Sequence, residues 1–344
     1  MSAPLSKHWS FNMRAWVIEE HGGPEVFKEV ELPTPEPGPG EVRIKVAATS
    51  VNPVDYKIRS GAAEALCPPK PAVLHGDVSG VVDKVGEEVQ GIVEGDTVYG
   101  CVGGCGAAQG ALADYVIADK QLIAKAPKSI PLEDCAALPL VTITAWEGLL
   151  KFGELNNQNL LVHGGTGGVG HMIVQLAKIW HAKVFTTVGT HEKAKLAKQL
   201  GASETINYKE ETIEQYVDRL TNGKGFDAVF DTVGGANIAN SVQATKLNGQ
   251  VACIQGRGEI DGGQLHVRAV SLHLVFMLIP LLHNIERERH GAILQQAAAL
   301  VDNEQLKPLI DEKRFSFDQI AEAHAYAESG KQIGKVLVVH PDHV

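Results

Sequence analysis

A glycine-rich loop between an apolar run and an amphipathic stretch is the segment whose spacing most clearly predicts chemistry. The run Asn159–Val162 is predicted to be a buried parallel strand, and Gly165, Gly167 and Gly170 then form a G-x-G-x-x-G pattern. Apolar residues recur after the loop at helical spacing, so a helix that packs on a sheet should follow. Glycines at this spacing allow a tight turn, close approach of the backbone to a pyrophosphate, and close packing of helix on strand. The helix N-terminus would present free N–H groups to the phosphates, so the segment predicts a dinucleotide site.

The strand expected next, Ala182–Val188, indicates which dinucleotide would bind. A site for a cofactor with a free 2′-hydroxyl usually has an acidic residue at the end of this strand. Here the strand is followed by Gly189 and Thr190, and then by Lys193. A neutral turn and a lysine favour a 2′-phosphate through a charge-assisted hydrogen bond, although Glu192 does not fit this pattern. The sequence therefore predicts NADPH rather than NADH, with a purely solvent-exposed Lys193 as the alternative.

Composition limits the other classes of function. The chain has 344 residues, which suggests two domains, and a formal charge of −10 with a pI of about 5.8 argues against a nucleic-acid-binding surface. Five cysteines, an odd number, predict free thiols in a reducing cytoplasm. The most apolar run, Ala269–Leu282, contains His273 and Pro280 and is too short to span a bilayer, so we expect no membrane segment.

The remaining pattern divides the chain into a β-rich part and an α/β part. Roughly the first 125 residues alternate short strands with glycine turns, and strands and helices alternate from Leu132 onward. Such alternation predicts right-handed crossovers and a doubly wound parallel sheet, an α/β fold. A last strand at Lys335–His340 follows the α/β part and is expected to return to the β-rich domain. A helix is also expected within Phe315–Ser329, and an apolar strand at Leu272–Leu278.

Taken together, several segments resemble the medium-chain dehydrogenase/reductase superfamily, in particular its zinc-independent quinone and enone oxidoreductases. The resemblance implies a Rossmann NADPH-binding domain at residues 136–314. It also implies a chaperonin-10-like, mostly β catalytic domain at residues 13–135, completed by residues 315–344. The segments that carry it are Val51–Lys57, His75–Gly80, Gly95–Val98, Leu112–Tyr115, Leu138–Leu140 with Thr144-Ala145, the glycine loop, Ile206–Tyr208, Asp231–Gly235 and Ile333–Lys335.

The same resemblance allows a test for zinc. In the zinc alcohol dehydrogenases of this superfamily, a cysteine, a His–Glu pair and a later cysteine form the catalytic site. The corresponding positions here are Asn52 and Gly76-Asp77, and asparagine and glycine are poor zinc ligands. The four closely spaced cysteines of the structural zinc site are also absent from the sequence. We therefore expect no metal.

Without a metal, the resemblance implies hydride transfer from NADPH to a quinone or an α,β-unsaturated carbonyl compound. Donors must then stabilise the charge that develops on the carbonyl oxygen. Asn52, Tyr56 and Lys57 lie where the zinc enzymes have their catalytic cysteine, and they are the candidate catalytic residues. Wall packing is the more ordinary role for Tyr56, and a surface position is the alternative for Lys57. The final proton could come from water or from one of these donors.

The candidate cofactor-binding residues also follow from the resemblance. Tyr208 could instead be a buried residue at a strand end, and Thr144 only a helix cap. His163 and His171, which flank the loop, are expected to be packing residues. The complete set is Thr144, Gly165, Thr166, Gly167, Gly168, Val169, Gly189, Thr190, Lys193, Tyr208 and Gly256.

The sequence leaves two alternative functions open and also predicts an oligomeric state. The same scaffold could carry an enoyl-thioester reductase, although no basic cluster for its carrier stands out, or a non-enzymatic NADPH-binding protein like some lens crystallins. The apolar strand predicted at Leu272–Leu278 would leave an exposed sheet edge. We therefore expect a homodimer that pairs this edge across a two-fold axis, with an interior strand as the alternative.

Overall fold

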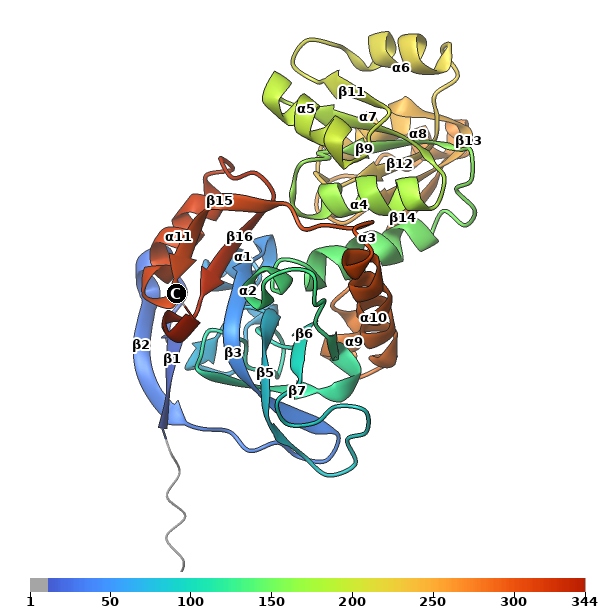
Figure 1. The fold of residues 1–344 in the computed structure, drawn as a ribbon. Helices are drawn as coiled ribbons and strands as arrows, with labels where there is room; N and C mark the ends of the chain where they lie inside the picture. Colours follow the sequence, from blue (N-terminus) through green and yellow to red (C-terminus); the bar gives the residue numbers. More distant parts are fainter. Residues whose placement is uncertain (1–11, 344) are drawn as a thin grey trace, which may run out of the picture.

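The predicted strand before the glycine loop lies in the middle of a six-stranded parallel sheet (Figure 1). The structure, a computed structural model, describes residues 12–343. The strand order β11-β10-β9-β12-β13-β14 is that of a Rossmann sheet, which confirms the predicted doubly wound fold. The order reverses between β9 and β12, and ligands of such sheets bind at that point. The strands are β9 (Asn159–His163), β10 (Lys183–Val188), β11 (Glu204–Asn207), β12 (Phe226–Asp231), β13 (Thr245–Cys253) and β14 (Ser271–Leu274).

The second lobe is built on a seven-stranded sheet whose strands come from both ends of the chain. The C-terminal strand β16 pairs antiparallel with β3, and β15 pairs parallel with β16. A small sheet of order β2-β1-β4 lies beside it. Its strands are β1 (Asn12–Ile18), β2 (Phe27–Pro33) and β4 (Ala72–Val73); those of the large sheet are β3 (Glu41–Val51), β5 (Asp77–Val85), β6 (Thr97–Cys101), β7 (Tyr115–Asp119), β8 (Ile123–Lys125), β15 (Ile310–Ser316) and β16 (Lys335–Val339).

Helix α3 lies between the two lobes and packs against α4 and α10 (Figure 1). A buried apolar cluster runs through this region and includes Val46 of β3, Leu149 of α3 and Val162 of β9. The helices are α1 (Pro53–Arg59), α2 (Leu132–Cys135), α3 (Pro139–Leu150), α4 (Gly168–Ile179), α5 (His191–Leu200), α6 (Ile213–Thr221), α7 (Asn237–Ala244), α8 (Gly262–Arg268), α9 (Ile279–His283), α10 (Glu288–Asp302) and α11 (Ile320–Glu328).

The structure corrects two of the predicted elements. The strand predicted over Leu272–Leu278 ends at Leu274, because the chain then turns and the side chains of Val275 and Leu278 become buried. Within the described residues β14 pairs only with β13, so its outer edge is open, as predicted. The helix predicted over Phe315–Ser329 starts later, since Phe315 and Ser316 still belong to β15.

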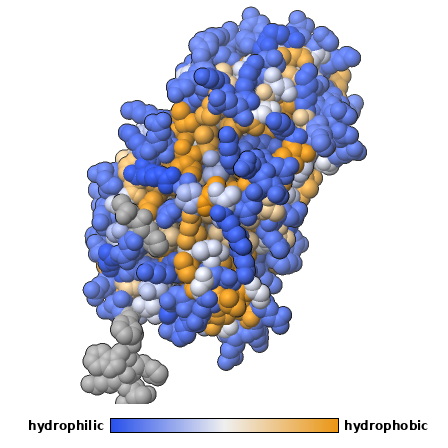
Figure 2. Space-filling model, in the orientation of Figure 1, coloured by the Kyte–Doolittle hydropathy of each residue, from blue (hydrophilic) through white to orange (hydrophobic). Residues whose placement is uncertain are grey.

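No helix among residues 12–343 is long and apolar enough to cross a bilayer. On the face shown in Figure 2, hydrophilic residues cover most of the surface, and hydrophobic residues gather in patches that include one between the two lobes.

Candidate active site

The glycine loop connects β9 to α4 and brings the N-terminus of this helix to the edge of the sheet. Gly164 has a φ of +75°, in the left-handed region that favours glycine. A Cβ on Gly170 would lie 2.1 Å from the carbonyl oxygen of Gly164, so glycine is required for the helix to pack this closely. Gly167 is the N-cap of α4, and the N–H groups of the following turn are free to bind phosphate.

A cavity of about 890 Å³ on one side of this loop contains the residues predicted to bind the 2′-phosphate. Lys193 and Tyr208 both line it. The Tyr208 side chain is 59% exposed, so it is not a buried strand-end tyrosine. A Cβ on Gly189 would lie 2.9 Å from the Tyr208 hydroxyl, which shows how closely the ring approaches the turn after β10. Glu192, the discordant residue in the sequence pattern, is exposed and does not line the cavity.

A second cavity of about 510 Å³ lies where α1 faces the ends of β13 and β14. Lys57, Thr144, Val169 and Gly256 line it together, so the structure unites predicted residues from four distant segments. Most of the other lining residues are apolar: Val54, Ala63, Leu66, Leu140, Val275 and Leu278.

The two cavities fit the two ends of a dinucleotide. Thr166 and Gly167 line the first cavity, together with Thr190, and Val169 lines the second. The pyrophosphate would then lie along the loop at the N-terminus of α4. Two of the predicted residues, Gly165 and Gly168, line neither cavity. Gly165 leaves room for Thr186, whose hydroxyl a Cβ would approach to 2.1 Å, whereas a Cβ on Gly168 would be in ordinary contact with Lys335 and Val141.

The candidate donors on α1 face different surroundings. Lys57 is half-buried on the cavity wall, and burial together with the nearby Arg257 lowers the pKa of its ammonium group. Tyr56, one residue earlier, points to a different side of the helix and does not line the cavity. Its pKa is raised by burial, with smaller contributions from Glu328 and Asp55. Lys57 is therefore the donor that α1 presents to the cavity.

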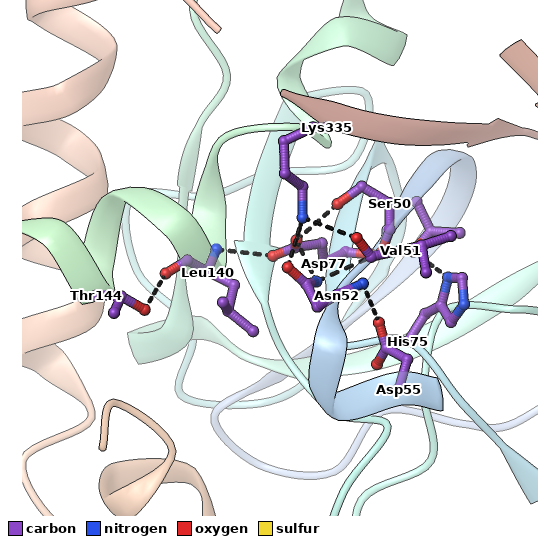
Figure 3. Close-up of polar contacts among 10 residues, drawn as sticks. Ser50, Val51, Asn52, Asp55, His75, Asp77, Leu140, Thr144 and Lys335 are labelled. Atoms are coloured by element: carbon purple, nitrogen blue, oxygen red, sulfur yellow. Dashed lines mark hydrogen bonds and ion pairs between the residues drawn. The ribbon is translucent and has the colours of Figure 1, made fainter. Parts of the chain in front are cut away.

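Asn52 forms the N-cap of α1, and its side-chain amide is engaged inside the protein (Figure 3). Its nitrogen donates to the Asp77 carboxylate at 2.8 Å, and its oxygen accepts a short hydrogen bond from the Lys335 ammonium. The side chain is 1% exposed, although the residue forms part of the cavity wall. With these contacts Asn52 holds the start of α1 in place. Its amide could contact a substrate directly only if it gave up its hydrogen bonds with Asp77 and Lys335.

Asp77 and Lys335 form a buried ion pair at the centre of this network (Figure 3). Their oxygen and nitrogen atoms are 3.4 Å apart, and the other oxygen of Asp77 accepts a hydrogen bond from the Leu140 N–H at the start of α3. Lys335 also donates to the carbonyl oxygen of Val51. The stem of Lys335 lies against Gly168, so one buried lysine contacts the ends of β3 and β5 and the cofactor loop.

The residues at the position of the catalytic zinc site do not fit a zinc ion. A Cβ on Gly76 would lie 2.9 Å from both the Cys101 sulfur and the Gly103 carbonyl oxygen, so this position has no room for a ligating side chain. Asp77 is engaged by Lys335 and by neutral donors. No group of three or more His, Cys, Asp or Glu side chains among residues 12–343 is arranged to hold a metal ion, and all five cysteines are free.

The remaining predicted polar residues near the cofactor loop have local partners. The Thr144 hydroxyl donates to the carbonyl oxygen of Leu140 at 2.6 Å within α3, while its side chain lines the second cavity. His171 is fully buried beside the Gly167 carbonyl, and burial lowers its pKa to about 4, so the ring is neutral. Burial also lowers the pKa of His163. His171 thus has the surroundings of a packing residue, whereas His163 is buried but also lines the first cavity.

Sequence reasoning missed two charged residues of the site. Lys335 was noted only as part of a family segment and a strand, although a lysine inside an apolar strand is itself a signal of a buried partner. Arg257 directly follows Gly256 and lines the second cavity, and no spacing pattern pointed to it.

Comparisons with known proteins agree with this geometry. Residues 38–128 match the family described as "Alcohol dehydrogenase GroES-like domain", and residues 200–338 match "Zinc-binding dehydrogenase". The chain is 36% identical over 336 residues to 2-methylene-furan-3-one reductase of Solanum lycopersicum, covering 96% of this chain and 79% of that protein. It is 34% identical over 333 residues to the chloroplastic NADPH-dependent alkenal/one oxidoreductase of Arabidopsis thaliana, covering 95% and 79%. The structure of Escherichia coli quinone oxidoreductase complexed with NADPH matches with a TM-score of 0.83 and 28% identity, covering 95% of this chain and 99% of that one.

Proposed function

Because this chain belongs to the medium-chain dehydrogenase/reductase superfamily, among the quinone and enone oxidoreductases, we propose that it reduces a quinone or an α,β-unsaturated carbonyl compound with NADPH and without zinc. The observation that carries the proposal is the half-buried Lys57 on the wall of an apolar cavity that also contains Thr144 and Gly256. That cavity lies beside the cofactor loop and can hold a nicotinamide and an apolar substrate together.

The proposed reaction moves a hydride and a proton onto one double bond. NADPH, when bound, would supply a hydride for the β-carbon of an enone, and the electron pair of the double bond would move toward the carbonyl oxygen. The Lys57 ammonium stabilises the negative charge on this oxygen, in a cavity where few other polar groups compete. A proton from water or from Lys57 would then add at the α-carbon, which gives the saturated ketone. Because its pKa is lowered, Lys57 is a better proton donor than an exposed lysine.

NADPH is proposed over NADH because Lys193 and Tyr208 line the cavity at the end of β10 without an acidic residue from the turn. Two carboxylates from the segment after β11 also line this cavity: Glu211 is paired with Arg219 at 2.7 Å, and Glu214 accepts a hydrogen bond from Gln243. Lys193→Ala should cost about 1.5–3 kcal/mol of NADPH binding, the range for a hydrogen bond to a charged group, and leave NADH binding almost unchanged. Titration calorimetry with both cofactors measures these binding free energies. An equal loss for NADPH and NADH would contradict the assignment of Lys193 to the 2′-phosphate.

The experiment that tests the reaction is a comparison of NADPH consumption with three acceptors. A quinone, an α,β-unsaturated ketone and an enoyl-CoA are offered side by side to the wild-type protein and to Lys57→Met. We expect turnover of the quinone or the ketone, and a large loss of kcat with Lys57→Met while NADPH still binds. Turnover of the enoyl-CoA alone would favour the thioester reductase, and binding of NADPH with no turnover would favour a non-enzymatic role.

We also propose that the protein is a cytoplasmic homodimer. The five free cysteines suit a reducing compartment. The open edge of β14 carries Leu274, which is 55% exposed, and Phe276, which is 47% exposed, follows it. Pairing of two such edges across a two-fold axis would bury both side chains and satisfy the free backbone groups.

A further inference from the structure

Arg257 crosses from the parallel-sheet lobe to the other lobe at the second cavity. It follows the end of β13, and its guanidinium donates to the carbonyl oxygen of Ala62, just after α1, at 3.2 Å. The residue is exposed and lines the same cavity as Lys57. Each lobe therefore contributes one cation to the wall of the cavity.

The two cations have no carboxylate partner. Among residues 12–343, neither Lys57 nor Arg257 forms an ion pair within 4.0 Å, whereas most other arginines of the chain do, such as Arg59, Arg219 and Arg287. Arg257 contributes, after burial, to the lowered pKa of Lys57, so the two positive charges on the cavity wall repel each other. Like charges that line an apolar cavity without a counter-ion are unfavourable in the free protein, and an anionic ligand would relieve this cost.

We propose that Arg257 binds a carboxylate on the substrate, so that the protein prefers an enone with a carboxylate at the far end of its apolar chain. This inference rests on the proposed function, in which Lys57 faces the carbonyl oxygen. The guanidinium keeps N–H groups beyond the one that Ala62 accepts, and it can bind a carboxylate with two parallel hydrogen bonds. Apolar side chains that line the same cavity, among them Leu66 and Leu278, would hold the connecting chain.

The test compares two substrates that differ in the charge of one terminal group and in the methyl group that removes this charge. They are a medium-chain alkyl vinyl ketone with a terminal carboxylate and the methyl ester of the same compound, each assayed with saturating NADPH. The wild-type protein should show a higher kcat/KM for the acid than for the ester. Arg257→Ala should lower kcat/KM for the acid by roughly tenfold to a hundredfold, the range for a charged hydrogen bond, mainly through KM. The ester should change less than twofold, and Arg257→Lys should restore part of the preference.

Matched controls separate this inference from the proposed function. Lys125→Ala removes an exposed positive charge that is paired with Asp96 far from the cavity, and it should leave both substrates unchanged. Equal kcat/KM for acid and ester, or an equal loss for both with Arg257→Ala, would overturn the role of Arg257 while the reductase activity stands. A loss confined to an enoyl-CoA would also overturn it, because the guanidinium would then bind phosphate. If neither ketone is reduced by the wild-type protein, the proposed function itself fails.

Discussion

Replacing Lys335 by methionine should destabilise the protein strongly, because it leaves the Asp77 carboxylate buried without a counter-ion. Both side chains are almost completely inaccessible, at 3% for Lys335 and 0% for Asp77. Removal of one partner from a buried ion pair typically costs about 3–5 kcal/mol. Asp77 keeps its hydrogen bonds from Ser50, Asn52 and the Leu140 N–H, so we expect a loss near the lower end, about 3 kcal/mol.

Urea unfolding, followed by tryptophan fluorescence and by circular dichroism, measures this loss. The double variant Lys335→Met with Asp77→Asn should be more stable than Lys335→Met alone, because the unpaired charge is gone, and the coupling energy should reach about 1–3 kcal/mol. The exposed pair Lys125 and Asp96 is the control, and breaking it should cost less than about 1 kcal/mol. If Lys335→Met unfolds within about 1 kcal/mol of wild type, the ammonium does not compensate the Asp77 charge and our account of this network is wrong.

Three further predictions concern pH, metal and assembly. Burial raises the pKa of the Asp55 carboxyl group from 3.8 to about 7, so the folded state binds the carboxyl proton more tightly than the unfolded state does. The stability that comes from this proton is lost as the pH rises from about 4 to about 7. The free energy of unfolding of Asp55→Asn should therefore rise relative to that of the wild type by a few kcal/mol as the pH increases over this range. Parallel curves of stability against pH for the two proteins would contradict this. Activity should survive treatment with a strong chelator. Stoichiometric zinc that is lost together with activity would contradict the conclusion that the site at Gly76 does not hold zinc. Light scattering should give about twice 36.8 kDa for the wild type and a monomer with an unchanged circular dichroism spectrum for Leu274→Lys; a concentration-independent monomer in the wild type would reject the dimer.

The sequence predicted the parallel sheet well because its elements carry local signals. The glycine loop has fixed spacing between a buried strand and a helix, and this spacing predicted both elements. Val275 was wrongly placed in a strand, since a continuous apolar run does not distinguish strand residues from residues of a cavity wall. In α1, Tyr56 and Lys57 were both candidate donors, but adjacent residues of a helix point about 100° apart, so only one faces the cavity.

Long-range polar contacts were beyond sequence reasoning. Lys335 and Asp77 are 258 positions apart, and the sequence around each residue does not identify the other as its partner. Arg257 is recognised as part of the cavity only after the fold places the end of β13 opposite α1. The contact of Lys335 with Asp77 depends on the assembly of distant strands within the seven-stranded sheet, and the contact of Arg257 with Ala62 depends on the packing of the two lobes. No local pattern specifies either arrangement.

The most direct test of the account is to follow the hydride itself. The protein is supplied with NADPH that carries deuterium at the transferable C4 position and with an α,β-unsaturated ketone, and the product is analysed by mass spectrometry and NMR. We predict a saturated ketone with one deuterium at its β-carbon, and a strongly reduced yield with Lys57→Met. A product without deuterium, or oxidation of NADPH without reduction of the double bond, would contradict hydride transfer to an enone at this site.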